Sequence, residues 1–149
     1  VEQENKELGF VGKPKKVDVK LLKEIIKEDF IPVITPMGLD GEGNPYNING
    51  DTAAGALAQS IKSRRLILLT DIDGVLDNNN KLISEIKTTE AEQLISNKII
   101  HGGMIPKIKS CCSAIHNGVR AVAIIDGRKP HSILFELFSD QGAGTLIRK

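Results

Sequence analysis

Apolar stretches alternate along the chain with segments of helical periodicity. Residues 66–70, Leu-Ile-Leu-Leu-Thr, form an apolar run without polar alternation, which is typical of a strand covered on both faces. Further strands are predicted at residues 30–35, 82–86, 119–125 and 145–148. Helices are predicted at residues 19–26, 52–61, 89–96, 106–117 and 130–138. Strands that alternate with helices predict an α/β fold, a three-layer α/β/α sandwich around a mostly parallel open sheet.

The predicted helix ends carry their usual sequence signals. Asp18 is placed to cap the first helix, and Thr89 with Glu92 has the spacing of a capping box. Pro106 suits a first helical turn, and Gly118 can adopt the left-handed conformation that ends a helix. These signals mark where the loops lie, and the candidate functional residues are found in those loops.

Composition limits the classes of protein to consider. With 149 residues and 40% hydrophobic content, the chain can bury the core of one ordinary domain. Its net charge of +1 provides no broad positive field, so we expect no nucleic-acid partner. The adjacent Cys111 and Cys112 are badly placed for a disulfide or a zinc site, which favours thiols on a packed helix.

The location of the protein is predicted from what the sequence lacks. No apolar stretch reaches the ~20 residues that cross a bilayer, and no signal peptide is recognisable, so we expect a soluble protein without a membrane partner. The chain begins at Val1 rather than at methionine and soon enters a strand-like piece at residues 8–12, which indicates a segment cut from something longer.

An acidic turn follows the strand at residues 66–70. Asp71 and Asp73 stand beside Gly74, and the carboxyl ends of strands in α/β sheets are where ligands bind. Glycine lets the backbone approach a phosphate or a base, so this turn is the first candidate for a phosphate-handling site. The alternative is a loop that only caps the neighbouring elements. Asp126 and Arg128 form a second polar group after a strand, which we interpret as structural.

A second constellation follows a turn-rich segment at residues 40–44. Asn47, Asn49 and Asp51 alternate along an extended piece, so their side chains can line one wall of a pocket for a polar small molecule. The alternative is a loop with a helix cap, because Asn and Asp are common cap residues.

The third constellation is the break before the helix at residues 106–117. Gly102 and Gly103 free the backbone there, and Lys107 projects from the first turn, a combination that traps anions. The alternative is a solvated lysine beside a flexible turn. Of the three histidines, His101 lies in this break, whereas the others are expected at helix ends, and no spacing supports a metal cage.

Six blocks together resemble a known family. They lie at residues 31–38, 46–54, 68–77, 102–107, 126–131 and 142–145, and they closely resemble the C-terminal portion of the N-acetylglutamate kinases, within the amino acid kinase family. The resemblance covers nearly the whole chain from residue 8 onward. It implies an amino acid kinase-like (carbamate kinase-like) fold and favours the functional interpretation of each constellation.

The resemblance implies an activity and roles for four residues. The reaction is transfer of the γ-phosphoryl group of ATP to the side-chain carboxylate of N-acetyl-L-glutamate, in arginine biosynthesis. In such chemistry the protein supplies positioning and charge neutralisation. Lys107 would hold the ATP phosphates and Asp51 would orient the catalytic lysines. Asn47 would contact the acetylglutamate, and Asn49 would line the same pocket.

The resemblance also implies a nucleotide site. ATP would bring its own magnesium ion, without a metal site on the protein. The nucleotide would lie along Thr70, Asp71, Ile72, Asp73, Gly74, Val75, Leu76, Ile99, Ile100 and His101.

Regulation and assembly are further implications. Residues 130–144 resemble relatives inhibited by arginine, which makes Glu136 and Gly142 candidate effector contacts. The full-length protein is expected to form a homo-oligomer in the cytoplasm or, alternatively, in the plastid stroma.

The chain departs from the family in two ways. The family's glycine-rich loop and second catalytic lysine belong to an N-terminal half that nothing here matches, so residues 1–149 are expected to be a C-terminal ATP-binding domain that binds ATP yet turns over negligibly alone. In addition, Asp73 stands where a small uncharged residue or proline is expected. A carboxylate beside phosphates is unfavourable unless it faces magnesium or solvent.

Two other functions remain open from the sequence. A strand followed by Asp-x-Asp-Gly also resembles the first motif of haloacid-dehalogenase-type phosphatases, in which Asp71 would be the nucleophile and Asp73 the acid/base. That motif belongs on a first strand, whereas several elements precede it here. A non-catalytic nucleotide-binding or regulatory module is the other alternative.

Overall fold

A four-stranded sheet in the order β5-β7-β8-β6 organises the C-terminal part of the chain. In this computed structural model, β5 (Leu66–Thr70) pairs parallel with β7 (Ala121–Asp126), and β6 (Glu85–Lys87) pairs parallel with β8 (Gly144–Arg148). The central pair β7 and β8 is antiparallel. The predicted mostly parallel sheet is therefore confirmed.

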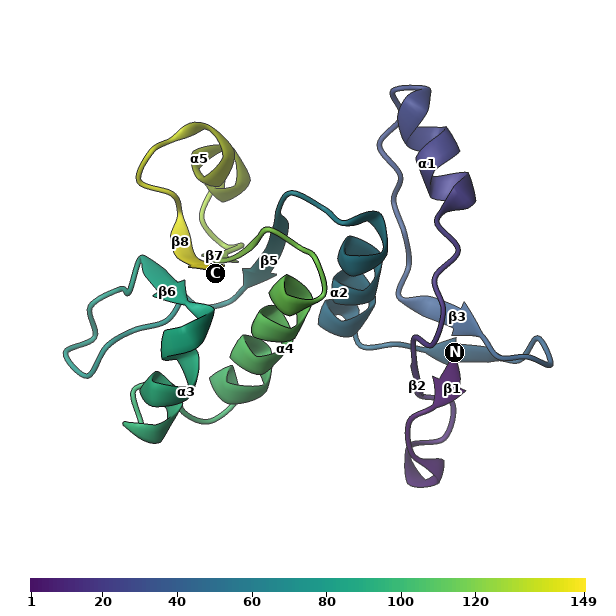
Figure 1. Ribbon diagram of the computed structural model, residues 1–149, viewed down its shortest axis with the longest axis horizontal. Helices are drawn as coiled ribbons and strands as arrows, with labels where there is room; N and C mark the ends of the chain where they lie inside the picture. The colour runs from purple at the N-terminus through teal and green to yellow at the C-terminus, as the bar shows by residue number, and fades with distance from the viewer. The chain divides into compact units, whose positions relative to one another are not determined.

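Helices cover both faces of this sheet (Figure 1). Helix α5 (Ser132–Phe138) lies on one side, and α3 (Thr88–Ser96) and α4 (Met104–His116) lie on the other. The core is centred on β7, in which Val122, Ala123, Ile124 and Ile125 are fully buried. This arrangement is the predicted three-layer sandwich.

The structure describes residues 1–149, except for the side chain of Lys6, and the chain divides into two compact units, Val1–Ile61 and Lys62–Lys149. This differs from the single domain expected from the length. The strands of the first unit pair only among themselves in the described chain: β1 (Glu2–Gln3) with β2 (Gly12–Lys13), and β3 (Met37–Leu39) with β4 (Pro45–Asn47).

The first unit also contains three helical segments. The strand-like piece expected at residues 8–12 begins with the last residue of a 3-10 helix, η1 (Lys6–Leu8), and becomes extended only at its end, where Val11 forms a bridge and Gly12 begins β2. Helix α1 (Lys20–Lys27) follows, and the side chain of Asp18 accepts a hydrogen bond from the backbone N–H of Lys20. Helix α2 (Gly50–Ile61) is the alanine-rich helix predicted at residues 52–61.

The strand predicted at residues 30–35 does not form. Ile31 is 91% exposed and Val33 is 95% exposed, and the segment joins none of the sheets of the described chain. An apolar run becomes a strand only where a partner satisfies its backbone N–H and C=O groups. Helix α1 likewise buries none of its residues, although its periodicity is strong.

Several local predictions hold with small shifts. The turn at residues 40–44 closes the β3–β4 hairpin, and Asp40 accepts hydrogen bonds from the backbone N–H groups of Glu42 and Asn44. At the start of α3, the carboxylate that accepts a hydrogen bond from the backbone is that of Glu90, with the N–H of Lys87 as donor. The sequence had predicted Glu92 for this role. Cys111 and Cys112 lie on α4 and form no disulfide.

No helix in the described part of the chain is long and apolar enough to cross a membrane.

Candidate functional site

The carboxyl ends of β5 and β7 lie side by side, because these strands pair parallel with Thr70 opposite Asp126. The acidic turn at residues 71–76 and the turn at residues 127–131 therefore leave the same edge of the sheet. The backbone N–H of Gly127 donates a hydrogen bond of 2.8 Å to the carbonyl oxygen of Thr70, which ties the two turns together.

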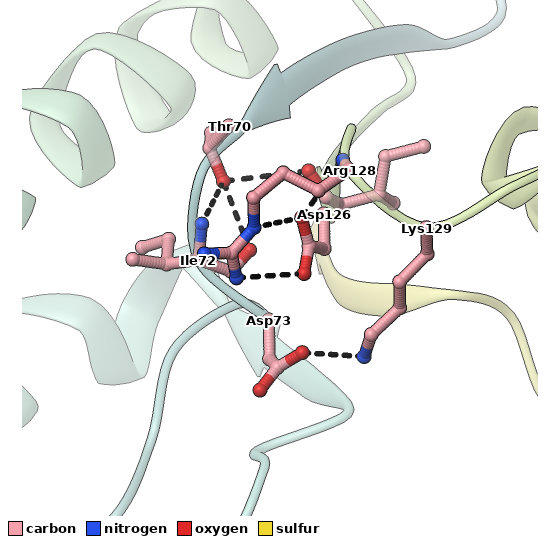
Figure 2. A network of polar contacts seen from close by, with 7 residues as sticks. Thr70, Ile72, Asp73, Asp126, Arg128 and Lys129 are labelled. Atoms are coloured by element: carbon pink, nitrogen blue, oxygen red, sulfur yellow. Dashed lines mark hydrogen bonds and ion pairs between the residues drawn. The ribbon is translucent and has the colours of Figure 1, made fainter.

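A network of charged side chains connects these turns (Figure 2). Arg128 donates to both carboxylate oxygens of Asp126, from Nε to Oδ1 and from a terminal nitrogen to Oδ2, each at 2.9 Å. The backbone N–H of Arg128 also donates to Oδ1 at 2.9 Å. These hydrogen bonds lower the pKa of Asp126 to about 2. The interpretation of this group as structural agrees with these contacts.

Asp73 forms an ion pair with Lys129 across the same edge (Figure 2). The side chain of Asp73 is 49% exposed and that of Lys129 is 58% exposed. The unexpected carboxylate in the acidic turn therefore meets an ammonium group supplied by the neighbouring turn.

Hydrogen bonds to Thr145, a residue of β8, hold the acidic turn in place. The buried backbone N–H of Val75 donates a hydrogen bond of 2.8 Å to Oγ1 of Thr145, and that hydroxyl donates to the carbonyl oxygen of Ile83 at 2.7 Å. Gly74 has a φ of +140°, and a Cβ there would lie 2.7 Å from Oγ1 of Thr145. Glycine is thus required for packing against Thr145, and the approach to a ligand that the sequence indicated stays a prediction.

A pocket of about 190 Å³ opens beside this turn. The turn supplies one part of its lining, and the break between α3 and α4 supplies the other. The lining residues are Ile72, Gly74, Val75, Leu76, Ile99, Ile100, His101 and Met104. The tertiary structure thus brings together the two segments that the sequence singled out for a nucleotide. Three other candidates from the same group, Thr70, Asp71 and Asp73, do not line this pocket.

Helix α4 begins at the pocket. Gly102, with φ of +55°, and Gly103 precede its first residue, Met104, which lines the cavity. Lys107 is three residues further along, so it lies one helical turn away on the same face of the helix. The amine of Lys107 and the N–H groups of the first helical turn are the features that bind anions at helix starts.

Asn47, Asn49 and Asp51 all belong to the first unit. Asn47 and Asn49 are exposed on either side of the buried Ile48, which matches the predicted alternation. Oδ1 of Asn49 accepts hydrogen bonds from the backbone N–H and the hydroxyl of Thr52, so Asn49 caps α2. Asp51 is in the first turn of that helix. The capping alternative therefore holds for Asn49.

Glu136 and Gly142, the candidate effector contacts, share a second pocket of about 180 Å³. Arg65 also lines this pocket, and it forms an ion pair of 3.0 Å with Oε1 of Glu136, whose side chain is 5% exposed. The other carboxylate oxygen accepts from the backbone N–H of Ala143. Arg65, an arginine of the chain itself, therefore already pairs with one oxygen of this carboxylate.

The remaining histidines lie at helix ends as predicted. His116 is the last residue of α4, and His131 precedes α5 with φ of +61°. Among the described residues, no group of three or more His, Cys, Asp or Glu side chains is arranged to hold a metal ion.

Sequence reasoning missed three residues of these sites: Lys129, Thr145 and Arg65. Lys129 directly follows Arg128 in a turn already noted, so its positive charge was a usable signal. Thr145 ends the family-like block at residues 142–145, but no role was attached to it. Arg65 lies outside the six blocks, before a predicted strand, and nothing in its neighbourhood distinguishes it from an ordinary loop residue.

Comparison with known proteins gives consistent matches. A family model described as the amino acid kinase family matches residues 1–126. The acetylglutamate kinase of Pelagibacter ubique is 56% identical over 149 residues, which are 100% of this chain and 52% of that protein. The acetylglutamate kinase of Rhodopseudomonas palustris is 50% identical over 143 residues, 96% of this chain and 48% of that protein. The chain spans about half the length of these curated relatives.

Solved structures match the fold. An N-acetylglutamate synthase from Neisseria gonorrhoeae complexed with coenzyme A and L-arginine has a TM-score of 0.87 and 28% identity, covering 95% of this chain and 33% of its own. A carbamate kinase from Giardia lamblia bound to AMP-PNP has a TM-score of 0.69 and 21% identity, covering 93% of this chain and 47% of its own, and this likeness concerns the fold alone. The expected carbamate kinase-like architecture is confirmed, and the family match argues against the dehalogenase-type phosphatase.

Proposed function

Because the chain belongs to the amino acid kinase family, we propose that it is the ATP-binding part of an acetylglutamate kinase. The enzyme would transfer the γ-phosphoryl group of ATP to the side-chain carboxylate of N-acetyl-L-glutamate in arginine biosynthesis. The names of the relatives at 56% and 50% identity support this assignment.

The observation that carries the proposal is the pocket between the acidic turn and the start of α4. Its walls are mainly aliphatic, from Ile72, Val75, Leu76 and Ile100, which suits the flat faces of an adenine ring. The start of α4, with Lys107 one turn beyond the pocket, suits the anionic end of the same nucleotide. An apolar wall and an anion site at one helix start fit a nucleoside triphosphate better than a neutral ligand.

Lys107 is the residue to which we assign the charge chemistry. Phosphoryl transfer spreads negative charge over the phosphoryl oxygens, so a fixed ammonium group stabilises its transition state. Magnesium would arrive with ATP and neutralise further phosphate charge. Lys107 follows Met104, which lines the pocket, by one helical turn, and this spacing supports the assignment.

We assign acceptor binding to the first unit. Asn47 is exposed on β4 and offers an amide to the acetylglutamate. The amide nitrogen of Asn49 can donate while its oxygen caps α2. Asp51, in the first turn of α2, is the candidate for orienting catalytic lysines.

Substitution of Lys107 tests the assignment. In the full-length protein, Lys107→Met should lower kcat by about 10²–10³-fold, the usual effect of removing one transition-state charge stabiliser. Lys109→Met, on the same helix, is the matched control and should leave turnover within twofold. ADP release coupled to an NADH readout measures both. Equal activity of the two variants would overturn the role of Lys107.

A second assay separates the kinase from a non-catalytic nucleotide-binding module. This chain should bind ATP and release negligible ADP alone, and it should become active when mixed with an N-terminal half taken from a relative. Full activity of the chain alone would contradict the division into halves. Binding without activity in the mixture would favour the regulatory module.

We also propose that the pocket containing Glu136 and Gly142 is an arginine effector site. The support is that the buried carboxylate of Glu136 already pairs with the guanidinium of Arg65. The solved synthase with a TM-score of 0.87 was complexed with L-arginine. Titration calorimetry of the full-length protein with millimolar L-arginine should give a saturable heat, which Glu136→Gln abolishes. Absence of heat would rule the site out.

A cytoplasmic homo-oligomer is the assembly that we propose for the full-length protein. The support is the resemblance to the family. Sedimentation of the full-length protein would test the oligomeric state.

A further inference from the structure

Five charged side chains gather where β5 and β7 end. Asp71, Asp73 and Asp126 are negative, and Arg128 and Lys129 are positive, so the edge has a surplus of one negative charge. The proposed function brings a triphosphate to the pocket beside this edge, where Ile72 and Gly74, the chain neighbours of Asp73, are part of the lining. An unpaired carboxylate near a polyphosphate repels it and weakens its binding, so the carboxylates at this edge have to be neutralised.

Arg128 is already used for Asp126. It makes two side-chain hydrogen bonds and one backbone hydrogen bond to that buried carboxylate. Its pKa is raised first by the hydrogen bond with Asp126, and also by the charges of Asp71 and Asp73 nearby. The field of the acidic turn therefore reaches the turn at residues 127–131, and Lys129 is the side chain there that pairs with Asp73.

We propose that Lys129 is a positioning residue for the nucleotide: by pairing with Asp73 it cancels a carboxylate that would repel the phosphates. This inference rests on the proposed function and adds a determinant of ligand charge to it. The family favours an uncharged residue at the position of Asp73, and the ion pair with Lys129 explains how a carboxylate is accommodated there.

The role of Lys129 is electrostatic because other contacts hold the turns in place. The backbone N–H of Gly127 donates a hydrogen bond to the carbonyl oxygen of Thr70, and the backbone N–H of Val75 donates one to the hydroxyl of Thr145. The Thr70 hydroxyl contacts the backbone N–H and C=O of Ile72 (Figure 2). None of these hydrogen bonds involves the Lys129 side chain. Loss of its ammonium group therefore leaves the shape of the pocket unchanged and alters the charge of the sheet edge beside it.

The consequence is a dependence on phosphate number. Replacing Lys129 by Gln leaves Asp73 unpaired, so the penalty grows with the negative charge of the ligand. Exposed ion pairs contribute up to about 1 kcal/mol, which corresponds to about fivefold in affinity. We expect Lys129→Gln to weaken ATP binding about fivefold, ADP binding about twofold, and adenosine binding not at all.

The experiment measures ATP, ADP and adenosine binding by calorimetry on the full-length protein and on four variants. Lys129→Arg should retain wild-type affinity, because it keeps the charge. Asp73→Asn should bind ATP as well as the wild type or better. The double variant Asp73→Asn with Lys129→Gln should return to within twofold of the wild type. The loss in Lys129→Gln should shrink between 20 mM and 300 mM salt, because screening weakens exposed charges.

Other outcomes overturn the inference in distinguishable ways. Unchanged ATP affinity in Lys129→Gln makes the pair irrelevant to the nucleotide. Equal losses for ATP and adenosine assign a purely structural role to Lys129. A double variant as weak as Lys129→Gln indicates direct contact between Lys129 and phosphate. A wild-type protein that binds no adenine nucleotide overturns the proposed function, and this inference with it.

Discussion

The backbone N–H of Val75 donates a hydrogen bond to the Thr145 hydroxyl at 2.8 Å, and both residues are buried. The same hydroxyl donates to the carbonyl oxygen of Ile83 at 2.7 Å. One side chain of β8 therefore fixes both ends of the loop at residues 75–83, whose first residues line the proposed nucleotide pocket.

Thr145→Val should destabilise the second unit and weaken nucleotide binding together. The substitution keeps the shape of the side chain but leaves the N–H of Val75 and the carbonyl of Ile83 without their partner. Buried polar groups left in this way cost about 1–3 kcal/mol in the free energy of unfolding. Urea denaturation measures the loss. Thr145→Ser keeps the hydroxyl and should lose less, and equal losses for the two variants would contradict this role.

Gly74→Ala should be more destabilising than an ordinary exchange of glycine for alanine. The φ of +140° is unfavourable for alanine, and its Cβ would lie 2.7 Å from Thr145 Oγ1 and 2.8 Å from Leu82 Cδ1. We expect a loss of about 2–4 kcal/mol from strain and overpacking.

Gly118→Ala is the matched control for that steric effect. Gly118 also has a positive φ, +110°, but its nearest neighbour, Lys62 Cγ, lies 3.8 Å from the Cβ position. It carries backbone strain without overlap. Thermal unfolding of the two variants separates the effect of backbone strain from that of steric overlap. An equal loss of stability at both positions would show that Thr145 does not restrict Gly74.

The Asp126–Arg128 pair should produce an acid-dependent step in stability. The carboxyl pKa falls from 3.8 to about 2 in the folded protein, mainly through the Arg128 side-chain hydrogen bonds. A lowered folded pKa favours the ionised form, so this stabilisation is complete above pH 3.8 and is lost as the pH falls toward about 2.

Arg128→Met should move the Asp126 pKa back up and flatten the stability curve between these two pH values. Carboxyl carbon shifts in NMR report the pKa, and denaturation at several pH values reports the stability. Asp126→Asn cannot titrate and provides the flat reference. An Asp126 pKa that stays low in Arg128→Met would assign the shift to the backbone hydrogen bond and the charge of Lys129 instead of the Arg128 side chain.

Cys112 should react slowly with alkylating agents at neutral pH. Burial raises the pKa of its thiol, and the charge of Glu92 raises it further. Since the thiolate is the reactive form, iodoacetamide should label Cys112 more slowly than it labels glutathione. Glu92→Gln should speed the reaction modestly. Mass spectrometry of the labelled peptide gives the rates, and labelling as fast as glutathione would contradict the raised pKa.

Local patterns predicted most elements, since each depends on neighbours close in the sequence. The run at residues 66–70 became β5, the alanine-rich segment became α2, and the turn formers after Leu39 closed a hairpin. The strand at residues 30–35 failed because pairing depends on a partner, and apolar content alone does not supply one. The periodicity of α1 likewise predicted a helix but not a surface that would bury it.

The candidate site was predictable in its parts but not in its connections. The acidic turn and the break before α4 were each recognisable from glycines, acids and a lysine. Their common pocket arises only because β7 pairs with β5 and α4 packs against β7. The role of Thr145 and the pairing of Lys129 with Asp73 join residues 70 and 56 positions apart, and no local pattern contains such a contact.

The sequence by itself determined the α/β alternation, the resemblance to the amino acid kinases and the segments that would hold a nucleotide, because periodicity, turn chemistry and ordered motifs are properties of short stretches. Only the tertiary structure decided which strands pair, why Gly74 must be glycine and which cation meets Asp73. Those outcomes depend on distances between residues far apart in the chain, which the folded backbone alone sets.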